Sequence, residues 1–229
     1  IDATTGISAD SSALFVERLY KTGLHNTSSL INKKDAVTET AYGINLSYNF
    51  KFLKVGLCWS EERFSIPVKP DISNPEYRYY FEGRRNDVYS LYYNSLIYRI
   101  LLYGELSMND PQNFALVQGV TLRPSDRLIL NILYRNYAPG FVSFHGNGPG
   151  NSSSTSNEHG ILGNFIFEAA KHLFISAGCD ISKSTWLKYR CSFPSLTKKE
   201  EIRIKYLPTD NLSFDLSYNF RSCMLDWQV

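Results

Sequence analysis

The chain has no apolar run long enough to form a transmembrane helix. Such a helix needs about 18 or more consecutive apolar residues, and no stretch of this sequence reaches that length. Helical membrane spans are therefore excluded. A surplus of one charge is missing as well, since 24 Lys and Arg face 22 Asp and Glu, for a net charge of +2. That balance argues against a protein that follows nucleic-acid phosphates.

Metal-type cysteine spacing and an export signal are also absent. The chain has four cysteines, with no CxxC pair among them: Cys58, Cys179, Cys191 and Cys223. The sequence thus predicts no metal site and no cofactor, and we expect these residues to be small wall or loop residues. Residues 1–10 show neither the basic nor the apolar part of a secretion signal. We expect that the signal was removed or that the chain starts partway through a longer protein.

About ten segments have the composition of long β-strands, and their connections alternate between short and long. The short connections are turns of a few residues: Asn49 to Phe52, Ile97 to Arg99, Arg123 to Asp126, Ala169 to Lys171 and Leu207 to Asp210. The connections between these turns are long, with one exception. The long ones are Ser65 to Arg85, Tyr137 to Glu158 and Ser182 to Glu200, and the exception is Asn109 to Asn113. Transmembrane barrels have short periplasmic turns and long outer loops, whereas a soluble sandwich has no reason to sort its loops in this way.

Side chains alternate along most of these segments. In the segment Thr38 to Phe50, large apolar residues occupy every second position and small polar residues the positions between them. The segment from Leu212 to Phe220 repeats the pattern. Because successive strand residues point to opposite faces, each strand would present one apolar and one polar face. Four segments alternate less cleanly, with apolar residues on both faces, and part of the interior is therefore expected to be packed: Asp87 to Ile97, Ile100 to Met108, Phe114 to Leu122 and Gly160 to Glu168.

The fold class that we predict is all-β, an antiparallel up-and-down transmembrane β-barrel with about ten strands visible here, part of a larger barrel. Residues 1–37 would be an extracellular loop region, with Phe15 to Tyr20 the end of an earlier strand and Thr27 capping a short helix over Ser28 to Lys34. Residues 38–229 would form the barrel strands. The Gly-, Ser- and Asn-rich loop from Pro139 to Glu158 should be mobile. The alternative is a soluble barrel or an antiparallel sandwich with one face in water.

Three runs resemble a known family. They are TGLHNTSSLINKKDAVTETAYGINLSY (Thr22 to Tyr48), LYGELSMNDPQNFALVQGVTLRPSDRLILNILYRNYAPGF (Leu102 to Phe141) and WLKYR (Trp186 to Arg190). The chain resembles the barrel region of helix-hairpin-helix domain-containing, competence-protein-like outer-membrane proteins of the Bacteroidota. The resemblance implies a large single-chain barrel. It does not imply DNA binding, because the helix-hairpin-helix residues are not in this sequence; nucleic acid would be bound only through a segment that is not present here.

Catalytic residues are not expected. The four histidines are His25, His145, His159 and His172, and none lies on a strand beside an obvious nucleophile. His25 belongs to the GLHNT motif that carries the resemblance, where a loop-packing role is the simpler interpretation. We therefore predict that the protein is not an enzyme.

Charged residues on the presumed luminal face are the better candidates for a site, because ionisable groups at membrane depth need partners or water. They are Lys54, Glu105, Arg135, Asp180, Glu201, Arg203, Lys205 and Asp215. A pore selective for one charge would show a ring of one sign. The mixed signs favour ion pairs that close the interior, with a solvated pathway as the alternative.

Aromatic residues near the strand ends are the other candidate set. Sixteen Tyr and three Trp suit the interfacial girdles of a barrel, and six residues are predicted to lie there: Trp59, Tyr98, Tyr134, Tyr137, Trp186 and Trp227. The cluster from Tyr77 to Phe81 could instead stack on sugars. Adjacent tyrosines of an extended strand point in opposite directions, however, and could not form one platform.

The sequence thus predicts a protein of the bacterial outer membrane, surrounded by outer-membrane lipid. It would act as a channel, an uptake component or a membrane anchor for a periplasmic domain. The alternative is an accessory structural subunit of a larger outer-membrane complex, in contact with other barrels or lipoproteins.

Overall fold

The computed structural model describes residues 1–7, 14–20, 25–110, 112–188, 191, 194–209 and 211–223. These residues form one sheet of twelve strands. Its first half comprises β1 (Asp2–Ile7), β2 (Leu14–Tyr20), β3 (Glu39–Asn49), β4 (Leu53–Val68), β5 (Gly83–Ile97) and β6 (Ile100–Asp110). Its second half comprises β7 (Asn113–Ser125), β8 (Leu128–Tyr137), β9 (Glu158–Ala170), β10 (Leu173–Lys183), β11 (Leu196–Thr209) and β12 (Leu212–Cys223). Two short helices accompany the sheet, α1 (Ser28–Ile31) and the 3-10 turn η1 (Pro75–Tyr77).

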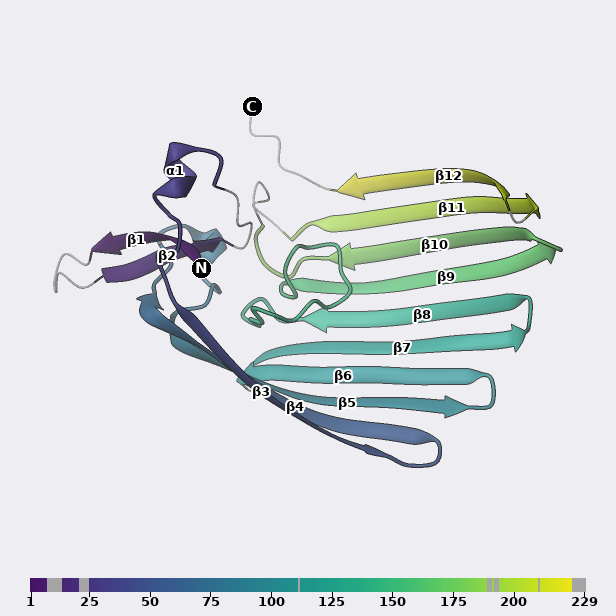
Figure 1. Ribbon diagram of the computed structural model, residues 1–229, viewed down its shortest axis with the longest axis horizontal. Helices are drawn as coiled ribbons and strands as arrows, with labels where there is room; N and C mark the ends of the chain where they lie inside the picture. Colours follow the sequence, from purple (N-terminus) through teal and green to yellow (C-terminus); the bar gives the residue numbers. More distant parts are fainter. Residues whose placement is uncertain are drawn as a thin grey trace.

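Strands β3 to β12 form an antiparallel meander in which each strand pairs with its neighbours in sequence. The five turns β3–β4, β5–β6, β7–β8, β9–β10 and β11–β12 lie at one end of this meander, and the longer loops gather at the other end with the N-terminal elements (Figure 1). The short connection between β6 and β7 also lies at the long-loop end. The all-β, mostly antiparallel prediction is confirmed, and the sheet has twelve strands where about ten were predicted, because β1 and β2 add a hairpin to the ten strands of the meander. The sheet is open: among the described residues, β3 pairs only with β4 and β12 only with β11. Barrel closure is thus not observed.

Two predicted turns lie slightly farther along the chain. Strand β7 continues through Pro124 to Ser125, and β11 continues through Pro208 to Thr209. The pairing register shifts at both places, between Leu122 and Ser125 and between Tyr206 and Thr209. Proline has no backbone N–H to donate to the ladder and is therefore tolerated at a bulge near a strand end. Asp210, which we predicted to end the second turn, lies outside the described residues.

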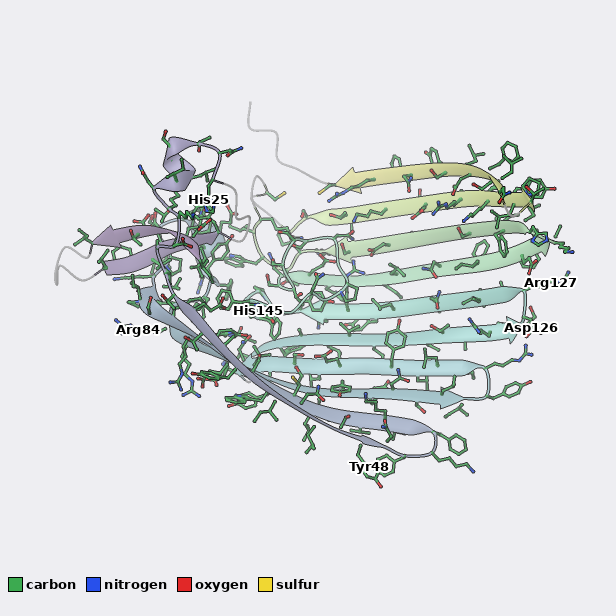
Figure 2. The ribbon with its side chains drawn as sticks, viewed as in Figure 1. His25, Tyr48, Arg84, Asp126, Arg127 and His145 are labelled. Carbon is green, nitrogen blue, oxygen red and sulfur yellow. The ribbon has the colours of Figure 1, made fainter. Side chains whose placement is uncertain are left out.

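One face of the meander is apolar. The register places the apolar half of every strand on the same side, including Leu46, Leu57 and Ile132, each of which is about half exposed or more. Between the tight turns and a row near the long-loop end, this face carries no Asp, Glu, Lys or Arg among the described residues. The row where charge begins comprises Glu61, Asp87, Lys183 and Glu200. Figure 2 shows the turn-end residues Tyr48, Asp126 and Arg127 far from His25 and His145.

Residues of the N-terminal region pack at the long-loop end. Strands β1 and β2 form a hairpin whose Val16 pairs with Val68, at the end of β4. A small core joins Ala3, Val16, Val37, Phe64 and Val68, all nearly inaccessible to solvent. A strand covers Phe15 to Tyr20, as predicted, but it pairs with β1 in this hairpin; that it ends an earlier barrel strand stays a prediction. The predicted helix cap is confirmed, since the Leu30 N–H donates to Thr27 Oγ1.

No helix among the described residues is long and apolar enough to cross a membrane. Of the four cysteines, Cys58, Cys179 and Cys223 lie in strands β4, β10 and β12.

Candidate functional site

All eight charged candidates lie on the face opposite the apolar one. Residues that pair across neighbouring strands point to the same face. Arg135 pairs with Val117 on one side and with Gly160 on the other. Val117 pairs in turn with Glu105, and Gly160 with Ser182, so these residues share a face. The same alternation places the others on this face: Lys54, Asp180, Glu201, Arg203, Lys205 and Asp215. We call it the polar face.

Arg135 is the centre of a buried ion cluster at the long-loop end of the polar face. Its side chain is fully inaccessible to solvent, as is almost all of Glu158. Arg135 Nε donates to Glu158 Oε1 at 2.7 Å, and Nη2 donates to Asp180 Oδ1 at 2.7 Å. The cluster thus joins β8, β9 and β10. Removing one member of such a buried pair lowers the stability of the fold strongly, because the other charge is left buried without a partner.

The loop between β8 and β9 is held by this cluster. The backbone N–H groups of Asn151 and Ser152 donate to the Glu158 carboxylate at 2.9 to 3.0 Å. The Asn151 side-chain amide donates to Asp180 Oδ2 at 3.2 Å and to Ser182 Oγ at 2.8 Å. The loop therefore folds onto the polar face (Figure 1). Its composition alone led us to expect mobility and did not reveal these contacts.

A second group of buried residues supports the same loop. Tyr137, almost completely buried, donates its hydroxyl to the carbonyl oxygen of Pro149 at 2.8 Å. Its ring belongs to a small core with Val88, Ala115 and Phe141. The polar face is thus packed at this end, as the apolar residues on both sides of β5, β6, β7 and β9 predicted.

The remaining charged candidates are exposed. Arg203 on β11 donates from Nε to Asp215 Oδ1 at 2.8 Å, an ion pair between adjacent strands. Glu105 accepts a hydrogen bond from Ser107 Oγ at 3.0 Å. Lys54, Glu201 and Lys205 are exposed residues of the same face. The observed ion pairs of the polar face join strands that lie side by side or, for Arg135 and Asp180, two strands apart. The sequence predicts pairs that cross the lumen, and none is seen among the described residues.

Glu158 is the member of the cluster that sequence reasoning missed. Its position after the Ser- and Asn-rich stretch predicts a loop residue. A usable signal was Gly160, which lies opposite Arg135 in the register. A Cβ at Gly160 would lie 3.0 Å from Arg135 Cζ and 2.8 Å from Ser182 Cβ. Glycine leaves room there for the guanidinium group.

Three of the predicted interfacial aromatics agree in position with the apolar face or its rim. Trp59 lies on that face, and its Nε1 donates to Asp87 Oδ1 at 3.2 Å, where the charged row begins. Tyr134 shares the face and contacts His159. Tyr98 is a turn residue, 87% exposed.

Two other aromatics require correction. Tyr137 has the opposite parity from Tyr134, so it points to the polar face and is buried beneath the loop. Trp186 lies in the loop between β10 and β11, where its Nε1 donates to the Pro75 carbonyl oxygen at 3.0 Å. Both residues pack against loops. Trp227 lies outside the described residues.

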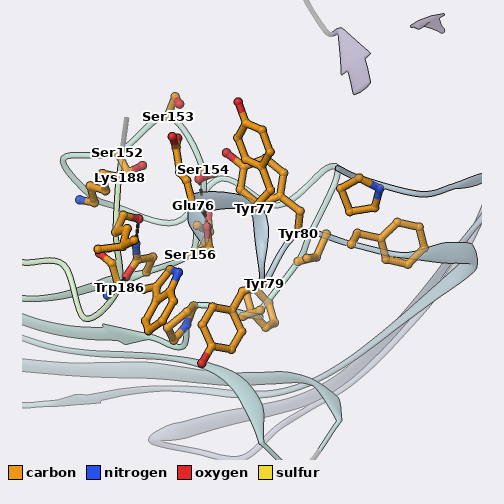
Figure 3. Close-up of a pocket in the computed structure, with 18 of the residues that line it drawn as sticks. Glu76, Tyr77, Tyr79, Tyr80, Ser152, Ser153, Ser154, Ser156, Trp186 and Lys188 are labelled. Carbon is orange, nitrogen blue, oxygen red and sulfur yellow. Dashed lines mark hydrogen bonds between the residues drawn. The ribbon is translucent and has the colours of Figure 1, made fainter. Parts of the chain in front are cut away.

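A cavity of about 980 Å³ opens among the loops at this end (Figure 3). Its walls come from β2, the loop that contains η1, the loop between β8 and β9, and the segment around Trp186. The lining residues include Ser152, Ser153, Ser154, Thr155 and Ser156 on one side, and Tyr77, Tyr79 and Tyr80.

Two of the histidines contact carboxylates that are distant in sequence. His25 lies 2.9 Å from Asp2 Oδ2, and His145 lies 3.0 Å from Glu39 Oε1. His172 occupies a tight turn with a positive φ of 66°. Among the described residues, no group of three or more His, Cys, Asp or Glu side chains could hold a metal ion.

Comparison with known proteins gives no relative. No family model, no curated protein and no solved structure matches this chain.

Proposed function

We propose that the meander is part of an outer-membrane β-barrel wall, with its apolar face against lipid. The observation that carries this proposal is the uncharged apolar face, which has exposed large apolar residues on nine of its ten strands, all but β7. In water, an apolar patch of this size would be a site of aggregation or of binding to another protein. A surface in contact with lipid, by contrast, has to be apolar.

The dimensions support lipid as the solvent of this face. On β10, the uncharged stretch runs from Leu173 to Ile181, and eight steps of about 3.3 Å extend about 26 Å. Bacterial barrels have an apolar band about 25 Å tall, flanked by aromatic residues. Trp59 and Tyr89 end the band on β4 and β5, next to the first charged pair.

The opposite face would then line the interior. It carries exposed charges of both signs toward the tight turns, and the folded loop covers it at the other end. A channel or uptake component could have this arrangement, with a loop that narrows its outer entrance. A membrane anchor with a closed interior could have it as well. Neither role requires catalysis.

The open edges favour a second candidate function. Strands β3 and β12 each expose one unpaired edge among the described residues, and an unpaired backbone group is costly in lipid. Because β3 and β12 run in opposite directions in a ten-strand meander, each could continue an antiparallel sheet. A partner that supplies strands at these edges would make the protein an accessory subunit of a larger outer-membrane complex.

Purification with and without detergent tests the membrane proposal. We expect the protein to stay folded in mild detergent or phospholipid vesicles and to aggregate when the amphiphile is removed. A protein that stays folded and monomeric without any amphiphile would contradict the proposal.

The same detergent extract distinguishes the two functions. A lone protein that conducts ions in a planar bilayer supports the channel, and a stoichiometric complex identified by mass spectrometry supports the accessory subunit. The resemblance to helix-hairpin-helix outer-membrane proteins stays a prediction. Partners such as lipoproteins, and nucleic acid through a further segment, are predictions of the same kind.

A further inference from the structure

We propose that the cavity at the long-loop end binds a neutral oligosaccharide, which stacks on tyrosine rings of one wall and bonds to serine hydroxyls of the other. This inference goes beyond the proposed membrane function and does not depend on it.

The aromatic wall is built by the turn η1. Asn74 caps this turn by accepting the Glu76 N–H at 3.0 Å. The turn and the residues after it bring Tyr77 and Tyr80 together, with ring centroids 4.9 Å apart and planes at 45°. The objection that adjacent tyrosines of a strand diverge therefore does not apply, because this segment is not extended.

A second aromatic pair continues the wall. Tyr79 meets Trp186 edge to face, with centroids 5.0 Å apart. Tyr79 is 37% exposed and Tyr80 is 53% exposed, so their surfaces are accessible to a ligand. The accessible side of an aromatic ring can stack on the apolar face of a sugar, as it stacks on other flat apolar groups.

The opposite wall supplies hydroxyl groups. Figure 3 shows Ser152, Ser153, Ser154 and Ser156 across the cavity from the tyrosines. Ser154 Oγ and Ser156 Oγ lie 3.1 Å apart. Within the described part of the chain, the hydroxyl groups of Ser152 and Ser153 make no hydrogen bond, so they can serve a ligand.

Both walls are fixed before any ligand arrives. The Glu158 carboxylate holds the backbone of Ser152. Asn157 Oδ1 accepts from the Trp186 N–H at 2.7 Å, and Asn157 Nδ2 donates to the Trp186 carbonyl oxygen at 3.1 Å. A preorganised site loses less ordering free energy on binding.

Charge and size indicate a neutral ligand of several sugar units. The lining includes three acidic and three basic side chains: Glu17, Asp71, Glu76, Arg18, Lys188 and Arg221. Arg18 already donates to the Tyr77 hydroxyl at 2.7 Å. The volume of about 980 Å³ lies near the upper end of usual ligand sites, which span roughly 300–1,000 Å³.

Isothermal titration of the full chain in detergent micelles tests the proposal. The probes are maltopentaose, cellopentaose, xylopentaose and chitopentaose, with pentagalacturonate as the acidic comparison and decaproline as a peptide comparison. We expect at least one neutral pentasaccharide to bind at millimolar concentration or below. Tyr80→Ala should weaken that binding about tenfold, the loss of one stacking contact. The control Tyr98→Ala removes an exposed tyrosine at the opposite end and should change nothing.

The outcomes separate this proposal from the membrane proposal. Far-ultraviolet circular dichroism checks that Tyr80→Ala folds, and Ser153→Ala, an exposed loop change, should weaken binding about threefold by itself. Binding of none of the neutral sugars, binding only of pentagalacturonate or decaproline, or binding unaffected by both variants would overturn the inference. If the protein remains folded without detergent, the membrane proposal fails and the titration still reports on the site.

Discussion

Arg135 and Arg203 form ion pairs of the same kind in opposite surroundings. Arg135 is fully buried between two carboxylates, whereas the Arg203 side chain is half exposed beside Asp215. We predict that Arg135→Ala lowers the free energy of unfolding by about 3–5 kcal/mol, because it leaves Glu158 and Asp180 buried and unpaired. Arg203→Ala should cost about 1 kcal/mol or less. Denaturant unfolding in detergent micelles measures both, and equal costs would show that the Arg135 cluster is accessible to water.

Gly160 allows a second test of the same cluster. A Cβ there would lie 2.9 Å from the Ile181 carbonyl oxygen as well as close to Arg135 and Ser182. We predict that Gly160→Ala destabilises the protein by about 1–3 kcal/mol through overpacking. Gly163, on the same strand, is the control, since a Cβ there meets nothing within 4 Å. Unfolding curves in which both alanine variants match the wild type would contradict the packing around Arg135.

The cluster shows how far sequence reasoning reaches at this scale. Alternation correctly placed Arg135 and Asp180 on one face, because strand parity is a local property. Glu158 was missed because its role depends on where β9 begins after a twenty-residue loop. Tyr137 was misplaced because an aromatic residue near a strand end suits the interface or a core equally well, and only its parity distinguishes the two.

Among the elements, β1 and the segment before β3 are joined by one carboxylate. The Asp35 N–H donates to Asp2 Oδ1 at 3.2 Å, and His25 lies beside Oδ2. The Asp35 hydrogen bond, followed by the contact with His25, lowers the pKa of Asp2 below its ordinary value. The charged form of Asp2 therefore stabilises the folded protein.

This lowered pKa predicts a pH dependence. The contribution of Asp2 is fully present above the unfolded-state pKa, about 4, and is lost as the pH falls through the lower folded-state pKa. Asp2→Asn should therefore lower the unfolding temperature at pH 7, and its difference from the wild type should shrink at pH 3. Asp126→Asn, at a turn where the side chain is 93% exposed, should show no such trend. A difference that stays constant from pH 7 to pH 3 would rule out a role for the Asp2 charge.

At the scale of the whole molecule, strand direction and loop length were predictable and closure was not. Turns and parity are local, and they specified the order of β3 to β12. Whether β3 meets β12, another strand of the chain or a partner depends on contacts between residues far apart in sequence. The pairing register leaves the outer edges of β3 and β12 free to pair with further strands. Whether water or lipid surrounds the sheet depends on the polarity of its two faces.

A lysine introduced on one face or the other of a single strand tests whether lipid or water covers that face. Leu46 lies on the apolar face of β3 and is 70% exposed, and Ser47 beside it lies on the polar face. If lipid covers the apolar face, Leu46→Lys should cost on the order of 2–4 kcal/mol at mid-depth and reduce insertion into phospholipid vesicles. Ser47→Lys should insert and fold like the wild type, because its side chain would enter the interior. Folding in vesicles, measured by circular dichroism and protease protection, distinguishes the two variants. Equal behaviour of the two variants would mean that water covers both faces, and the apolar face would then have to be an interface with protein.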